Sequence, residues 1–230
     1  MKKIVFFALL SSISATGHSG EYPIGHYIGV EAKLRHVPFE KNFGHNIFRE
    51  NFPEGNVFFG LKFNDHLGLE IGYSQTTSRK MNTSIIGPET ILGLSLPAGR
   101  AEIFTTTAQM NALSISLMGF IPLNDNFEVL CGMGMNRTHV KLSYQPTANA
   151  NGQLSPNVAQ ARLRDFSKNK YIMQAKVGLQ YWLTQNISLR TLVGWENTAK
   201  FKCLSSKQPS ALRASLKDSF TVSLGLAWHF

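Results

Sequence analysis

The last eleven residues of the chain are Phe220-Thr-Val-Ser-Leu-Gly-Leu-Ala-Trp-His-Phe230. Large apolar side chains occupy every second position, and small or polar residues, with one histidine, stand between them. Successive side chains of a β-strand point to opposite faces, so this period of two predicts a strand with one apolar face. That face comprises Phe220, Val222, Leu224, Leu226, Trp228 and Phe230, and the alternation continues to the final residue.

Seven earlier segments have the same period, and each is about long enough to cross a bilayer as a tilted strand. They are His26 to His36, Val57 to Phe63, Leu67 to Ser74, about Thr107 to Gly119, Phe127 to about Tyr144, Lys170 to Trp182, and Ile187 to Glu196.

The connections between these segments alternate in length. Tight turns rich in Asn and Asp are expected at 64–66, 122–126 and 183–186. Long connections are expected at 37–56, 75–106, 145–169 and 197–218. Up-and-down threading puts all the short turns on one side, which is typical of outer-membrane barrels. The sequence therefore predicts an all-β fold: an eight-stranded antiparallel up-and-down transmembrane β-barrel with short periplasmic turns and four long extracellular loops.

The composition agrees with a barrel. The chain has 230 residues, a length that fits one domain, and a mean hydropathy of −0.09. No run of 18 apolar residues follows the N-terminal segment, so no transmembrane helix is expected there. A barrel hides its apolar surface in alternate residues, which keeps the mean hydropathy near zero.

The N-terminus has the pattern of a signal peptide. Lys2 and Lys3 precede a short apolar run, and Ala15-Thr16-Gly17 fits a cleavage site. We expect a signal peptide over 1–17, cleaved at about 17–20, followed by a barrel over 22–230. An amphipathic or buried N-terminal helix is the alternative. Given export, the net charge of +9 favours anionic lipid or lipopolysaccharide over nucleic acid as a partner.

The face opposite the apolar one is small or polar and contains four acids and four bases. Unpaired charges inside a narrow barrel would be costly, so we expect these residues to neutralise one another. They can form either a plug of salt bridges or the lining of a narrow pore. A soluble, lipocalin-like binder is disfavoured, because its interior would be bulky and apolar. The eight residues are Glu31, Lys33, Lys62, Glu70, Glu128, Lys176, Arg190 and Glu196.

Outward aromatic residues should gather at the two bilayer boundaries. The lower girdle is expected to contain Phe63, Phe127, Tyr181, Trp228 and Phe230, and the upper girdle Tyr73, Trp195 and Phe220.

The C-terminal segment resembles the terminal signature of outer-membrane barrels, which ends in an aromatic residue. The segments LGLEIGY (67–73), FEVLCGMGM (127–135) and LGLAWHF (224–230) are similar to strands of the OmpA/OmpX-like family of small surface barrels. The resemblance covers about 22–230 and implies that the barrel assembly machinery recognises Phe230, Trp228, Leu226 and Leu224. The chain departs from full-length OmpA-type proteins because no peptidoglycan-binding domain follows the last strand.

No catalytic, cofactor or metal motif is evident. The seven histidines show no metal-ligand spacing, and Cys131 and Cys203 are expected to be free thiols. Ser223 and His229 share a face but lie about 20 Å apart along a strand, too far for a dyad. His139 and Ser143 share a face without an evident orienting acid. The chain is therefore not expected to be an enzyme, with a lipid-modifying enzyme as the minor alternative.

The expected function is to anchor surface loops that contact lipopolysaccharide or anionic host glycans. A narrow porin for small solutes or ions is the alternative. The fourth long loop, 197–218, concentrates positive charge and contains one acid, Asp218. Its possible polyanion-binding residues are Lys200, Lys202, Lys207, Arg213 and Lys217.

Overall fold

The structure is a computed structural model that describes residues 25–39, 48–86, 89–91, 94–96, 101–149, 164–197, 199–200 and 215–230. Among these residues there is no helix with the length and apolar character needed to cross a membrane. The strands are β1 (His26–His36), β2 (Asn51–Lys62), β3 (Leu67–Thr76), β4 (Arg79–Ile86), β5 (Glu89–Ile91), β6 (Leu94–Leu96), β7 (Ala101–Asn124), β8 (Phe127–Asn149), β9 (Arg164–Trp182), β10 (Ile187–Glu196), β11 (Ala199–Lys200), β12 (Ser215–Leu216) and β13 (Ser219–His229).

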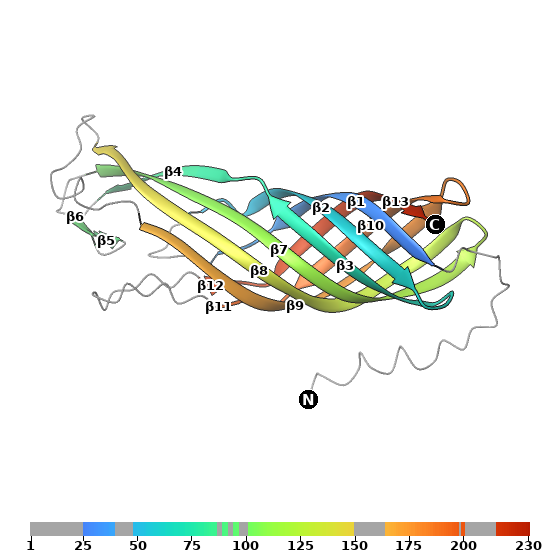
Figure 1. The fold of residues 1–230 in the computed structure, drawn as a ribbon. Helices are drawn as coiled ribbons and strands as arrows, with labels where there is room; N and C mark the ends of the chain where they lie inside the picture. The colour runs from blue at the N-terminus through green and yellow to red at the C-terminus, as the bar shows by residue number, and fades with distance from the viewer. Residues whose placement is uncertain are drawn as a thin grey trace.

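The strands form a closed, eight-stranded antiparallel barrel, as the sequence predicted (Figure 1). The order is β3-β2-β1-β13-β10-β9-β8-β7-β4, and β3 also pairs with β7. β3 and β4 pair with successive parts of the long strand β7, so together they occupy one strand position of the barrel. The first and last strands close the ring, with Ile28 opposite Trp228 and the Phe230 amide donating to the His26 carbonyl at 2.9 Å.

The two ends of the barrel differ. Both ends of the barrel segment and the three short turns lie at one end, called here the turn end. The strand ends that lead into the long connections lie at the other, the loop end (Figure 1). One side-chain oxygen stabilises each short turn by accepting two backbone N–H groups. Asn64 Oδ1 accepts from His66 and Leu67, Asn124 Oδ1 from Asn126 and Phe127, and Thr184 Oγ1 from Asn186 and Ile187.

Strands occupy parts of all four predicted loops, which corrects their expected boundaries; in the fourth, β11 pairs with β12 inside 197–218. β7, β8 and β9 have 24, 23 and 19 residues, so parts of 75–106 and 145–169 are strand. β4 pairs with Ala101–Ala108 of β7, and β2 begins at Asn51, inside the first predicted loop. At the loop end, β4, β7, β8 and β9 therefore extend further along the barrel axis than the other strands (Figure 1).

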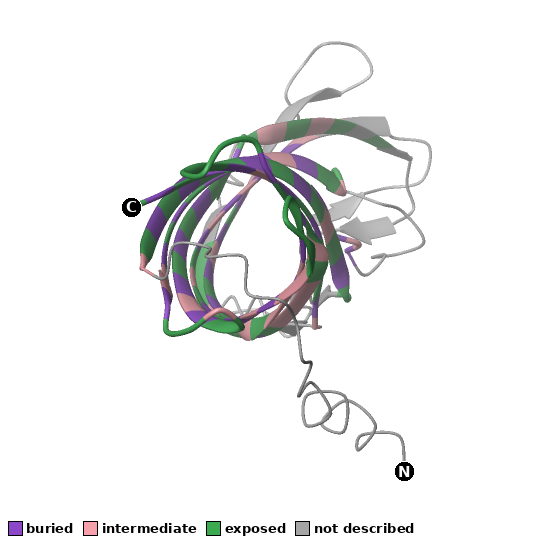
Figure 2. Cartoon of the chain, turned by 90° about the vertical axis from the view of Figure 1, so that its right-hand side faces the viewer, coloured by how far each residue is buried: buried purple, intermediate pink, exposed green. Residues whose placement is uncertain are grey.

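The two faces of the barrel follow the predicted parity. Val30 and Leu224 point outward with 56% and 54% exposure, whereas Glu31 and Ser223 point inward with 4% and 7%. Figure 2, viewed from the turn end, shows this alternation around the closed ring. Gly60 faces the lumen, where the Tyr27 ring occupies the space that a Cβ would need.

Candidate functional site

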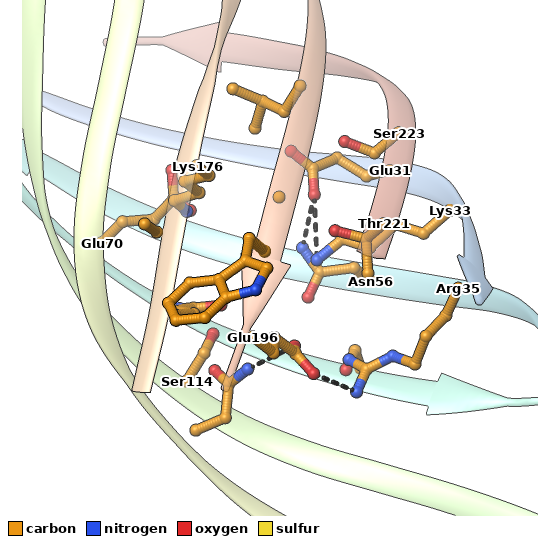
Figure 3. Close-up of a pocket in the computed structure, with 17 residues that line it drawn as sticks. Glu31, Lys33, Arg35, Asn56, Glu70, Ser114, Lys176, Glu196, Thr221 and Ser223 are labelled. Carbon is orange, nitrogen blue, oxygen red and sulfur yellow. Dashed lines mark hydrogen bonds and ion pairs between the residues drawn. The ribbon is translucent and has the colours of Figure 1, made fainter. Parts of the chain in front are cut away.

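The lumen holds the strongest concentration of polar chemistry among the described residues. At mid-height the Arg190 guanidinium joins two carboxylates: Nε donates to Glu31 at 2.7 Å and Nη1 to Glu70 at 2.8 Å. Lys176 Nζ donates to the other Glu70 oxygen at 2.6 Å, and Lys33 Nζ lies 3.3 Å from Glu31. Five of the eight predicted lumen charges thus meet here, from β1, β3, β9 and β10. Figure 3 shows four of them, Glu31, Lys33, Glu70 and Lys176.

A second charged group lies nearer the loop end. Arg35 donates to Glu54 at 2.6 Å and to Glu196 at 2.9 Å, and Asn136 donates to Glu196 at 2.7 Å. Figure 3 shows the Arg35–Glu196 contact. Arg35 and Glu54 were not among the lumen charges predicted from the sequence. The parity of β1 places Arg35 on the face of Glu31, so the period of two was sufficient to find it. Glu54 lies in a segment that was expected to be a loop.

A third charged group lies nearer the turn end. Lys62 donates to Glu128 at 3.2 Å, and Gln180 donates to the other Glu128 oxygen at 3.0 Å. The Lys62 ammonium also lies 4.2 Å from the centre of the Phe120 ring, where a cation–π attraction adds to the ion pair. The structure therefore brings all eight predicted charges into three neighbouring groups inside the barrel.

Apolar side chains lie at both ends of this charged region. The floor cluster, toward the turn end, comprises Tyr27, Phe58, Met118, Phe120, Leu130, Leu192 and Ala227. The mouth cluster, toward the loop end, comprises Val37, Phe39, Phe48, Phe52, Ala108, Met110, Val140, Leu142 and Ile172. The mouth cluster was not predicted, because much of it comes from segments that were expected to be loops.

A small cavity remains between the mid-height group and the Arg35 group. Its volume is about 30 Å³, which has room for about two water molecules. The side-chain oxygens Asn56 Oδ1 and Asn136 Oδ1 belong to residues that line it, and within the described part of the chain neither has a hydrogen-bond partner. Both residues are buried, so the cavity suits hydrogen-bond donors such as water.

The described residues offer little reactive chemistry. His229 Nε2 lies 2.9 Å from Ser188 Oγ, so the serine beside this histidine is Ser188 on the neighbouring strand and not Ser223. His229 and Ser188 are 2% and 0% exposed, and His229 packs beside Tyr27 and Trp182, so both side chains are buried from solvent. His139 contacts Asn169 and Ser167 on the outer surface. No group of three His, Cys, Asp or Glu residues in the described ranges could hold a metal ion.

The structure describes only some of the remaining predicted site residues. The terminal residues Leu224, Leu226, Trp228 and Phe230 all point outward and are 47–62% exposed. The girdle aromatics are exposed as well. Lys217 is exposed beside β13. Lys202, Lys207, Arg213 and Cys203 lie outside the described residues, and only the backbone of Lys200 is described.

Known proteins share this architecture. The model of the outer membrane protein beta-barrel domain family matches residues 5–230. A major outer membrane protein from Thermus thermophilus is 14% identical with a TM-score of 0.52, over 89% of this chain and 99% of that chain. Neisserial surface protein A is 12% identical with a TM-score of 0.52, over 90% and 97%. OprG from Pseudomonas aeruginosa is 12% identical with a TM-score of 0.50, over 91% and 98%. No curated protein sequence matches the chain.

Proposed function

The chain belongs to the outer membrane protein beta-barrel domain family, and from that premise we propose that it is a closed barrel that anchors surface-interacting loops. Its place is the bacterial outer membrane, with the loops exposed at the cell surface. The lumen then serves stability and shape, and the interaction chemistry lies on the loops and the outer rim.

The filling of the lumen carries this proposal. Arg190, Glu128 and Lys62 are at most 3% exposed, and each is bound by partners from other strands. An eight-stranded barrel has an interior just wide enough for side chains, so a filled interior leaves no continuous water column. The floor and mouth clusters add an apolar barrier on each side of the charges.

Bilayer conductance tests the proposal. Refolded full-length protein should insert without stepwise currents above the leak of the bare bilayer. As a positive control, Phe120→Ala combined with Phe52→Ala thins both apolar clusters and should introduce current if the clusters are barriers. Discrete steps from the unmodified protein would contradict the proposal.

A narrow porin is the second candidate, and the lumen cavity is the observation that favours it. The cavity lies between charged groups and is lined by unpartnered amide oxygens, as a resting point for a small solute would be. If conductance steps occur and Asn136→Leu alters their size, this alternative replaces the closed barrel.

Three further parts of the proposal rest on the sequence. Residues 1–17 act as a signal peptide, and the C-terminal strand acts as the recognition signal for the barrel assembly machinery. The basic loop 197–218 contacts polyanions, either lipopolysaccharide or host glycans. The absence of enzymatic activity belongs to the same proposal. The net charge of +9 supports contact with an anionic surface.

A further inference from the structure

The outward side chains of β7, β8 and β9 change from apolar to polar and basic at one level of the barrel. On β8 the outward residues Met133 and Met135 are followed by Arg137, His139 and Lys141. β8 enters the lower girdle at Phe127, whose ring lies 4.7 Å from that of Tyr181 on β9. A tilted strand crosses a bilayer in about ten residues, so Arg137 lies at the opposite boundary. Tyr171, the outward residue of β9 opposite Arg137, is 69% exposed and belongs to the same level.

The neighbouring strands complete this surface in register. Three rows of outward residues run across β7, β8 and β9, which lie side by side (Figure 1). They form the outer basic patch: Leu113–Arg137–Tyr171, Asn111–His139–Asn169 and Gln109–Lys141–Ser167.

The patch is rich in hydrogen-bond donors. None of its nine residues is acidic, and the amides, hydroxyls and two permanent cations are groups that bind phosphate oxygens. His139 links two of the rows, because its Nδ1 lies 2.7 Å from Asn169 Oδ1 in its own row and its Nε2 lies 3.1 Å from Ser167 Oγ in the next. In the next row along the strands, Ser143 of β8 pairs with Asp165 of β9, so the register brings an acid beyond the three rows that hold Arg137 and Lys141.

We infer that the outer basic patch binds the phosphates of lipopolysaccharide in the outer leaflet. The position selects this ligand, because the patch begins just beyond the lipid-facing Met135. Leu113 and Tyr171, in the row of Arg137, can contact acyl chains below Lys141. A soluble glycan approaching the loops would meet the far tips of β7 and β8 first. This site is separate from the basic loop 197–218, and it does not require the lumen to be closed.

The test compares two forms of one lipid. Full-length protein refolded in a neutral detergent is titrated with lipid A carrying both phosphates and with the dephosphorylated lipid, and complexes are counted by native mass spectrometry. Each basic residue near an anionic surface is worth about fivefold in affinity, so Arg137→Gln with Lys141→Gln should weaken binding of phosphorylated lipid A about 30-fold. Binding of the dephosphorylated lipid should not change.

Two variants serve as matched controls. Lys168→Gln removes an exposed charge from β9 on the face opposite the patch, where its register partner Val140 is buried, and should leave affinity unchanged. Arg137→Lys with Lys141→Arg keeps the charge and should retain most of the binding. Equal affinity of the Gln double variant and the parent for phosphorylated lipid A would overturn the inference. Loss of heparin binding without loss of lipid A binding would also overturn it, because the patch would then serve a glycan.

Discussion

At the scale of single residues, the direction of a side chain decides what a charge costs. Leu224 points into lipid and its neighbour Ser223 into the lumen. We expect Leu224→Arg to destabilise the folded barrel by about 2–4 kcal/mol, the cost of a cation near the bilayer midplane. Ser223→Arg should cost less, although crowding against the lumen charges reduces the difference. Urea titrations of both variants in lipid vesicles measure this, and equal costs would mean that the faces are assigned wrongly.

Arg190 is the residue on which the mid-height charged group depends most. It is 1% exposed, and its guanidinium lies 3.7 Å from the Phe58 ring while it binds Glu31 and Glu70. Arg190→Met removes the cation and leaves two buried carboxylates with fewer partners. Breaking a buried pair in this way costs about 3–5 kcal/mol. The free energy of unfolding should fall by that amount, and Arg190→Lys should recover part of it. A variant as stable as the parent would show that the network contributes little.

At the scale of elements, the last strand has two roles that can be separated. Phe230 bonds to His26 through its backbone and exposes 61% of its side chain. If the aromatic side chain is part of the assembly signal, Phe230→Gly should lower the outer-membrane yield in cells. The same variant should refold from urea into detergent, because the strand pairing is kept. Normal yield in cells would refute the assignment of the signal.

The basic loop is a second element with a testable role. Changing Lys200, Lys202 and Lys207 to Gln removes three charges from 197–218. Binding to heparin should weaken and its dependence on salt concentration should become shallower, because fewer counterions are released. A matched variant at Lys33, inside the lumen, should not change heparin binding. If the triple variant binds with the parent's affinity and salt slope, the loop is not the site.

The strand boundaries show where the period-two rule works and where it fails. Within the bilayer, apolar residues such as Leu113 and Ile115 point outward, which made eight strands visible in the sequence. Beyond the bilayer the apolar residues of β7 change to the inward face. Ala108 and Met110 point inward to the mouth cluster, while Gln109 faces water. A search for one continuous apolar face therefore ends near Thr107, although β7 begins at Ala101.

The alternation of side chains along each strand predicted which residues face the lumen, but it did not predict which of them contact one another. Sequence position places Glu31 and Arg190 on inward faces, yet their separation of 159 positions along the chain conceals that they meet. Pairing depends on strand tilt and stagger, which the sequence does not show. The Ser188–His229 contact was missed for the same reason, since it joins neighbouring strands β10 and β13 at a register that no motif marks.

At the scale of the whole molecule, closure makes the barrel one cooperative unit. β1 pairs with β13 over ten register positions, so each spanning strand has a neighbour on both sides. In lipid no water replaces a lost hydrogen bond, so partial opening is unfavourable. We therefore expect folded protein to resist dodecyl sulfate until it is heated. Unheated samples should migrate faster on gels than boiled ones and show a β-rich far-ultraviolet spectrum. A chain lacking Ser219–Phe230 leaves β1 and β10 with unpaired edges and should show a single, unfolded mobility. Retention of the fast band by that truncated chain, or a helical spectrum from the intact one, would contradict closure through β1 and β13.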